Sequence, residues 1–226
     1  LGGLNRYDPH TEEFTHFLHD DGNPSSINNN NVNVLYLDKN DNLWLGTPRG
    51  IDLFDRVTGD FKHKGFNPLQ QWDASNRNIT AIYEDSIGRF WIGTADSGLG
   101  RLSSNGNALF FSYQRSAGNE NETENEDVIE NENTISHNYV TKIIEDVNGI
   151  LWIGTRNGLN RFVPETGEFQ RFMHRDRVAE SITDNTINDL HLDLTGNLWV
   201  ATANGLDRLD AESGTFIHYR NDPTFS

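Results

Sequence analysis

The chain has 226 residues and no cysteine, only one methionine and six prolines. Without cysteine there are no disulfides and no thiolate ligands for a metal ion. Basic residues are scarce, because 18 Lys and Arg stand against 34 Asp and Glu, and the formal net charge is −16 at pH 7. This charge argues against nucleic acid or an anionic membrane as the main partner. No apolar run is long enough to cross a bilayer.

Motifs of catalysis are also missing. The eight His residues are scattered, and no HExxH pair, Gly-rich phosphate loop or Ser/His/Asp order occurs. Asp96 or Asp184 with Glu180 could be imagined as the carboxylate pair of a glycosidase or lyase, but the sequence supplies no geometry for it. We therefore predict that the chain is not an enzyme and that it holds no cofactor.

What the chain does contain is an internal repeat. Asp146–Phe162 reads DVNGILWIGTRNGLNRF, and three other segments follow the same pattern: Asp38–Phe54, Asp85–Leu102 and Asp193–Leu209. The intervals between the repeated Trp44, Trp91, Trp152 and Trp199 are 47, 61 and 47 positions. Gly3–Asp8 lies 47 positions before Gly50–Asp55, so the chain holds four and a half copies.

Each copy predicts four short strands. In the third copy they are Val140–Glu145, Leu151–Thr155, Leu159–Val163 and Glu168–Met173, joined by Gly-containing turns. Four short antiparallel strands at a period in the forties are what one β-propeller blade requires. The sequence therefore predicts an all-β arc of four-stranded blades. We place a half blade at residues 1–17 and blades at about 32–64, 79–113, 140–173 and 187–219.

These blades are too few to close a ring by themselves. Completing the half blade at the start would take about 25 residues, as judged from the first two strands of the next blade and their lead-in, and only seven follow the last blade. We expect an open arc of one partial propeller domain, which belongs to a larger ring or closes by partnering. Exposed blade faces and strand edges would favour a homodimer.

Aromatic residues recur at fixed places in the blades. The repeated Trp is most simply a core residue between blades, because a blade is a small sheet that cannot bury both faces alone. An aromatic platform for a sugar is the alternative, although a ligand site rarely recurs in every blade. The predicted fourth strands carry Phe14 and Phe17, Phe110 and Tyr113, Phe169 and Phe172, and Phe216 and Tyr219.

The segment 114–137 departs from the repeat. Between Ser116 and His137 it has seven acidic residues and no Lys or Arg, so we expect a mobile surface loop. A calcium site is the alternative, since oxygen ligands are present, but their spacing fits no calcium loop and we predict no metal site. The candidate ligands are Glu120, Glu122, Glu124, Asp127 and Asn131.

The signature WIGT-x-x-GL, preceded by Asp-x-x-Gly-x-Leu, resembles the two-component regulator propeller repeat, and the resemblance covers nearly the whole chain. That family builds sensor regions of bacterial hybrid two-component systems. Its repeats usually form seven-bladed periplasmic propellers, often two in series, upstream of a membrane-proximal β-sandwich and a histidine kinase. The resemblance implies a ligand-sensing module, with further blades and a membrane-proximal domain in the same polypeptide.

Loops on a rigid scaffold are where binding residues collect. In a propeller, the turns between strands two and three and the segments that join blades lie on one face. A polar ligand such as an oligosaccharide suits their side chains, because a Trp ring can stack on a sugar and Arg can bond hydroxyls or carboxylates. The predicted binding residues are Arg49, Trp72, Arg77, Asp96, His137, Arg156, Asn157 and Asn204. The blade-joining segments also contain Asn138, Arg175, Arg177 and Asn185.

A purely structural role is the alternative for several of these residues. Asn30, Asn138 and Asn185 share one repeat position, which favours a structural role in capping the loop. Trp72 could simply pack its own long loop. A protein–protein interaction scaffold without a small ligand is the second functional hypothesis.

Overall fold

The computed structural model describes residues 2–64, 78–102 and 133–219, in which all regular secondary structure is β-strand. Within these ranges no helix is present that could span a bilayer. Several predictions lie outside the described residues: most of the acidic segment, the second blade's fourth strand with Phe110 and Tyr113, and the candidate residues Trp72 and Arg77.

The chain divides into two compact units, which we describe separately. The first contains Leu1–Asp96 with Gly100–Phe110, and the second Ser97–Leu99 with Phe111–Ser226. Whether the chain is a single partial domain, with the predicted blade boundaries, stays a prediction.

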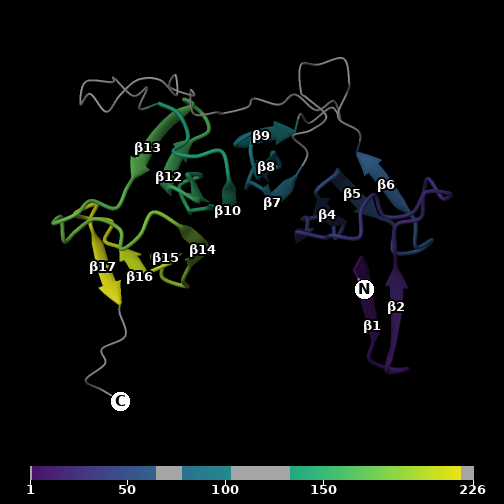
Figure 1. Ribbon diagram of the computed structural model, residues 1–226. Helices are drawn as coiled ribbons and strands as arrows, with labels where there is room; N and C mark the ends of the chain where they lie inside the picture. Colours follow the sequence, from purple (N-terminus) through teal and green to yellow (C-terminus); the bar gives the residue numbers. More distant parts are fainter. Residues whose placement is uncertain (1, 65–77, 103–132, 220–226) are drawn as a thin grey trace. The chain divides into compact units, whose positions relative to one another are not determined.

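The first unit contains three antiparallel sheets in chain order (Figure 1). A two-stranded sheet pairs β1 (Leu4–Asp8) with β2 (Glu13–Phe17). A four-stranded sheet follows, with β3 (Val34–Leu37), β4 (Leu43–Thr47), β5 (Gly50–Phe54) and β6 (Phe61–Lys64). A three-stranded sheet consists of β7 (Ile79–Glu84), β8 (Phe90–Thr94) and β9 (Leu99–Leu102), of which Leu99 is counted with the second unit.

The second unit contains two complete four-stranded sheets (Figure 1). One consists of β10 (Val140–Glu145), β11 (Leu151–Thr155), β12 (Gly158–Val163) and β13 (Glu168–Phe172). The other consists of β14 (Ile187–Leu192), β15 (Leu198–Thr202), β16 (Gly205–Leu209) and β17 (Phe216–Tyr219). Within each of these two sheets, every strand pairs antiparallel with the next strand in the chain, so the predicted all-β fold of four-stranded blades is confirmed.

The core of each unit lies between successive sheets. In the second unit, Trp152 of β11 belongs to one buried cluster with Leu190 and Phe216 of the next sheet. In the first unit, the Phe17 ring lies with its centroid 4.8 Å from that of Phe54 in the following sheet. Phe14 is three positions before Phe17, hence on the opposite face of the strand, and is 59% exposed.

The glycine of the WIGT motif marks the closest approach between sheets. A Cβ at Gly154 would lie 2.7 Å from Ile187 Cγ2 on the first strand of the next sheet. A Cβ at Gly46 would lie 2.6 Å from Ile79 Cγ2, in the corresponding place of the first unit. Because real side chains do not come this close, the motif needs glycine wherever the following sheet packs in this way.

Candidate functional site

The repeated Trp is tied to the Asp that opens its own repeat. Each indole Nε1–H donates to the Oδ2 atom of that Asp, at 2.8, 2.9, 3.0 and 2.9 Å in the four copies. Trp91 and Trp152 are buried, and Trp44 and Trp199 are half-buried. This favours the core role of Trp over a sugar platform. Sequence reasoning missed the bond, although the constant six-residue spacing from Asp to Trp was its signal.

Three of these carboxylates, those of Asp38, Asp85 and Asp193, have pKa values below their usual range. The hydroxyl of Thr195, followed by the indole of Trp199, holds the pKa of Asp193 well below its usual range. Burial raises the pKa of Asp85, but the hydrogen bonds from Trp91 and Arg89 outweigh it and the net shift is downward. These groups therefore act as hydrogen-bond acceptors of the repeat and are poorly suited to donating a proton in catalysis.

The segment that joins β13 to β14 folds around a few side-chain bonds. The His174 N–H donates to Asn185 Oδ1 at 2.6 Å, and the His174 Nδ1 lies 2.7 Å from the carbonyl oxygen of Ile182. The Arg175 N–H donates to Ser181 Oγ at 3.0 Å. We call residues 174–183 the joining loop. Its backbone is thus fixed by its own side chains.

The first unit holds the same arrangement 155 positions earlier. The His19 N–H donates to Asn30 Oδ1 at 2.7 Å, the His19 Nδ1 lies 2.7 Å from the carbonyl oxygen of Ile27, and the Asp20 N–H donates to Ser26 Oγ at 3.0 Å. Asn30 and its counterpart in the second unit therefore cap their loops, which is the structural role that the sequence favoured for them.

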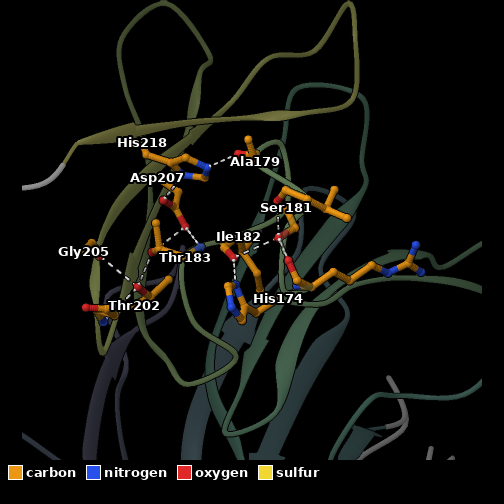
Figure 2. A network of polar contacts seen from close by, with 12 residues as sticks. His174, Ala179, Ser181, Ile182, Thr183, Thr202, Gly205, Asp207 and His218 are labelled. Atoms are coloured by element: carbon orange, nitrogen blue, oxygen red, sulfur yellow. Dashed lines mark hydrogen bonds and ion pairs between the residues drawn. The ribbon is translucent and has the colours of Figure 1, made fainter.

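A buried carboxylate fastens the joining loop to the last sheet (Figure 2). Asp207 on β16 is fully buried and accepts hydrogen bonds from the N–H and hydroxyl of Thr183, at 2.8 and 3.0 Å. Its other oxygen lies 2.8 Å from His218 Nδ1, while His218 Nε2 lies 2.5 Å from the carbonyl oxygen of Ala179. The loop is therefore held at both its middle and its end.

Beside these hydrogen bonds of Asp207 and His218 lies a hollow of about 440 Å³. It is lined by His174, Arg175, Arg177, Val178, Ala179, Ser181, Ile182, Thr183 and His218, with no Asp or Glu among them. Arg177 adopts a left-handed backbone with φ of +66°, an uncommon conformation for a residue other than glycine. A second hollow, of about 480 Å³ in the first unit, is lined by Gly3–Asn5 and Val32–Leu35 and has no charged residue. The first hollow is the better candidate site.

The six predicted binding residues that the structure describes do not line this hollow. His137 and Arg156 meet at Tyr139: the Arg156 guanidinium carbon is 3.7 Å from the ring centroid, and His137 Nδ1 accepts the Tyr139 N–H at 2.9 Å. The Asn157 and Asn204 N–H groups bond the Thr hydroxyl that closes their turns.

The two predicted residues of the first unit are Arg49, whose Nη1 is 3.4 Å from His19 Nε2, and Asp96, which is exposed. None of these six residues lines the hollow, and their role in binding stays a prediction. In the described ranges, no group of three or more His, Asp or Glu is placed to hold a metal ion.

The antiparallel four-stranded sheets and their repeated Asp–Trp pairs define propeller blades. Three segments, residues 26–49, 73–96 and 134–157, match the family model described as "Two component regulator propeller". These matches confirm the resemblance to this repeat that the sequence predicted. No curated protein matches the chain.

Solved structures extend the likeness to nearly the whole chain. The extracellular domain of a hybrid two component system from B. thetaiotaomicron is 25% identical, with a TM-score of 0.72, over 98% of this chain and 26% of that one. A second such domain from the same organism is 21% identical, with a TM-score of 0.69, over 98% and 25%. This chain therefore spans about a quarter of the length of those structures.

A virginiamycin B lyase from Staphylococcus aureus also has this fold. It is 16% identical, with a TM-score of 0.61, and the likeness covers 97% of this chain and 63% of the lyase. At this identity the likeness shows the fold alone and carries no argument for lyase chemistry.

Proposed function

We propose that the chain is a periplasmic ligand-sensing propeller module of a bacterial two-component-type receptor, without enzymatic activity of its own. Further blades and a membrane-proximal domain of the same polypeptide would complete it. A polar ligand, such as an oligosaccharide, binds at the hollow beside the joining loop. The family repeats and the likeness to an extracellular receptor domain support the sensing role.

The choice of binding site rests on a contrast between the hydrogen bonds that fix the joining loop and the side chains that line the hollow. The joining loop is fixed by bonds that recur in the first unit, whereas the side chains that face the hollow at 175 and 177 do not recur. A loop that is already ordered loses little conformational entropy when a ligand binds. The loop conformation is thus shared between repeats, whereas the side chains lining the hollow are specific to this one. A sensor needs both a rigid support and a specific binding surface.

A thermal-shift screen of the chain against neutral and acidic oligosaccharides tests the proposal. A ligand at a hundred times its Kd stabilises the folded protein by about 2.7 kcal/mol. We expect Val178→Trp, which fills part of the hollow, to abolish the response. Val147→Trp places the same side chain on a turn tip that is 93% exposed and should leave the response intact. If no saccharide stabilises the protein, the proposal fails.

An interaction scaffold is the second candidate, and exposed apolar turn tips favour it. Val147 and Leu194 occupy the same place in the β10–β11 and β14–β15 turns, and they are 93% and 108% exposed. Apolar side chains at repeated exposed tips suit contact with another protein, including a second copy of this chain. Sedimentation of the chain and of the Val147→Asp/Leu194→Asp variant tests this role. Self-association that the double substitution removes would support it, and a monomer in both cases would argue against a homodimer.

A further inference from the structure

We infer that the ligand of this hollow is an acidic saccharide, and that the guanidinium groups of Arg175 and Arg177 bind its carboxylate. The inference rests on the proposed function, because it names the class of ligand for the same site.

The charge of the lining points to an anion. The chain as a whole carries a net charge of −16, yet the hollow is lined by two arginines and two histidines and by no carboxylate. Asp176 and Glu180 belong to the same loop but do not line the hollow. Two arginines without a carboxylate in the same lining favour ligands of the opposite charge.

The two arginines are the groups left available. Both ring nitrogens of His218 are engaged, with Asp207 and Ala179. His174 bonds Ile182 through Nδ1, and its Nε2 lies 3.4 Å from Asp176 Oδ1. In the described part of the chain, neither the Arg175 nor the Arg177 guanidinium makes a hydrogen bond or an ion pair, so each can offer its planar donor fork to a carboxylate.

The first unit shows that the fold of the joining loop does not require these arginines. Asp20 and Gly22 stand at the positions of Arg175 and Arg177 in a loop with matching bonds. The Phe61 N–H donates to the carbonyl of Ser25 at 2.8 Å, just as the Phe216 N–H donates to that of Glu180 at 3.0 Å. Folding of the loop therefore does not explain the arginines.

Backbone conformation adds a second indication. Arg177 holds a left-handed φ of +66°, a region that favours glycine over residues with a Cβ. Strained residues of this kind cluster at ligand-binding sites, where the surrounding structure holds them. Here the hydrogen bonds of the joining loop on either side of Arg177 supply that support.

Titration calorimetry of the 226-residue chain provides the test, with trisaccharides of galacturonate, glucuronate and mannuronate as probes and their methyl esters as uncharged matches. We expect at least one acid to bind and its ester to bind about tenfold to a hundredfold more weakly, as the loss of a charge-assisted bond implies. This comparison uses the unchanged protein, so it does not depend on the folding of any variant.

The matched variant is Arg175→Asp/Arg177→Gly, which copies the residues of the first unit. It should fold with an unchanged circular dichroism spectrum and lose acid binding by a hundredfold or more. Arg56→Ala, in the exposed turn after β5, removes an arginine that does not line the hollow and should leave the Kd unchanged.

Equal binding of acid and ester, or native affinity in the double variant, would overturn the inference while the proposed function stands. Binding of neutral saccharides alone, or of a sulfated disaccharide in place of every uronate, would overturn it as well. If no saccharide of any charge binds, the proposed function falls with it.

Discussion

The indole N–H of the repeated Trp makes a side-chain bond that occurs in all four copies of the motif. Its acceptor also receives backbone N–H groups of the turn; in the third copy, Asp146 Oδ1 accepts those of Asn148 and Ile150 at 2.9 and 3.1 Å. The Asp thus joins the turn to the large residue that fills the space between sheets. Each bond to a charged group contributes about 1.5–3 kcal/mol.

A double-mutant cycle measures this link. We expect Trp152→Phe and Asp146→Ala to destabilise the protein separately, with a coupling energy of about 1–3 kcal/mol in urea unfolding. Trp152→Phe combined with Asp189→Ala is the control, because Asp189 bonds the Lys142 ammonium on the surface and should give an additive effect. A coupling indistinguishable from that control would show that the indole bond contributes nothing.

Acid should weaken the fold through the same carboxylates. The pKa values of Asp38, Asp85 and Asp193 lie below their usual range in the folded protein. Their contribution to stability is therefore complete above the unfolded pKa of about 4 and is lost as the pH falls through the folded pKa values. Urea unfolding at a series of pH values from 7 to 2.5 should show a loss that begins near pH 4. Asp193→Asn should have a shallower slope in this range, and an unchanged slope would contradict the assignment.

At the scale of the strand, the spacing between sheets depends on one small residue. Gly154 lies where Ile187 of the next sheet and Thr141 of its own sheet approach, with gaps of 2.7 and 2.9 Å to a Cβ. A strand that carried a side chain here would displace the neighbouring sheet. The last copy has Ala201 at the equivalent position, where the motif reads WVAT.

We predict that Gly154→Ala destabilises the second unit by about 1–3 kcal/mol, the cost of overpacking a close contact. Chemical unfolding monitored by Trp fluorescence measures it. Ala201→Gly is the matched control at the same repeat position, and it should change stability by less than about 1 kcal/mol. Gly154→Ala without effect would mean that the two sheets slide apart at little cost.

At the level of the elements, the repeat predicted the strands well and the site less well. Period and turn residues are local signals, so β10–β13 and β14–β17 could be placed from the sequence. The hollow is lined by both His174 and His218, which are 44 positions apart in the sequence. They come together only because β17 lies against the joining loop, where the Phe216 N–H donates to the Glu180 carbonyl oxygen. Arg175 and Arg177 belonged to a segment expected to face ligand. Nothing in the sequence showed that their guanidinium groups are free while Arg156 is stacked on Tyr139.

For the whole molecule, the excess of acidic residues is the dominant property. A net charge of −16 on 226 residues makes the folded state repel itself, and this repulsion falls as salt shortens the screening length. The charge is a property of composition, so it could be read directly from the sequence, unlike the geometry of the hollow.

We expect the Tm to rise when NaCl is increased from 20 to 500 mM, by about 2–4 °C for each kcal/mol of repulsion that is screened. Differential scanning calorimetry measures the change. KCl at equal ionic strength should have the same effect, because screening depends on ionic strength and not on the cation. A Tm that is flat or falls with salt would show that favourable ion pairs outweigh the repulsion.

The joining loop and its counterpart at residues 19–26 have a consequence for how repeats of this kind can diversify. The same set of internal bonds closes around His19–Ser26 and around His174–Ser181, although five of the eight residues differ. Mutation can therefore alter the inner positions of such a loop with little risk to folding, and gene duplication supplies new copies to vary. Under the proposed function, ligand preference can change in one blade while the other blades keep the fold, which makes this loop the place where the binding specificity can be altered.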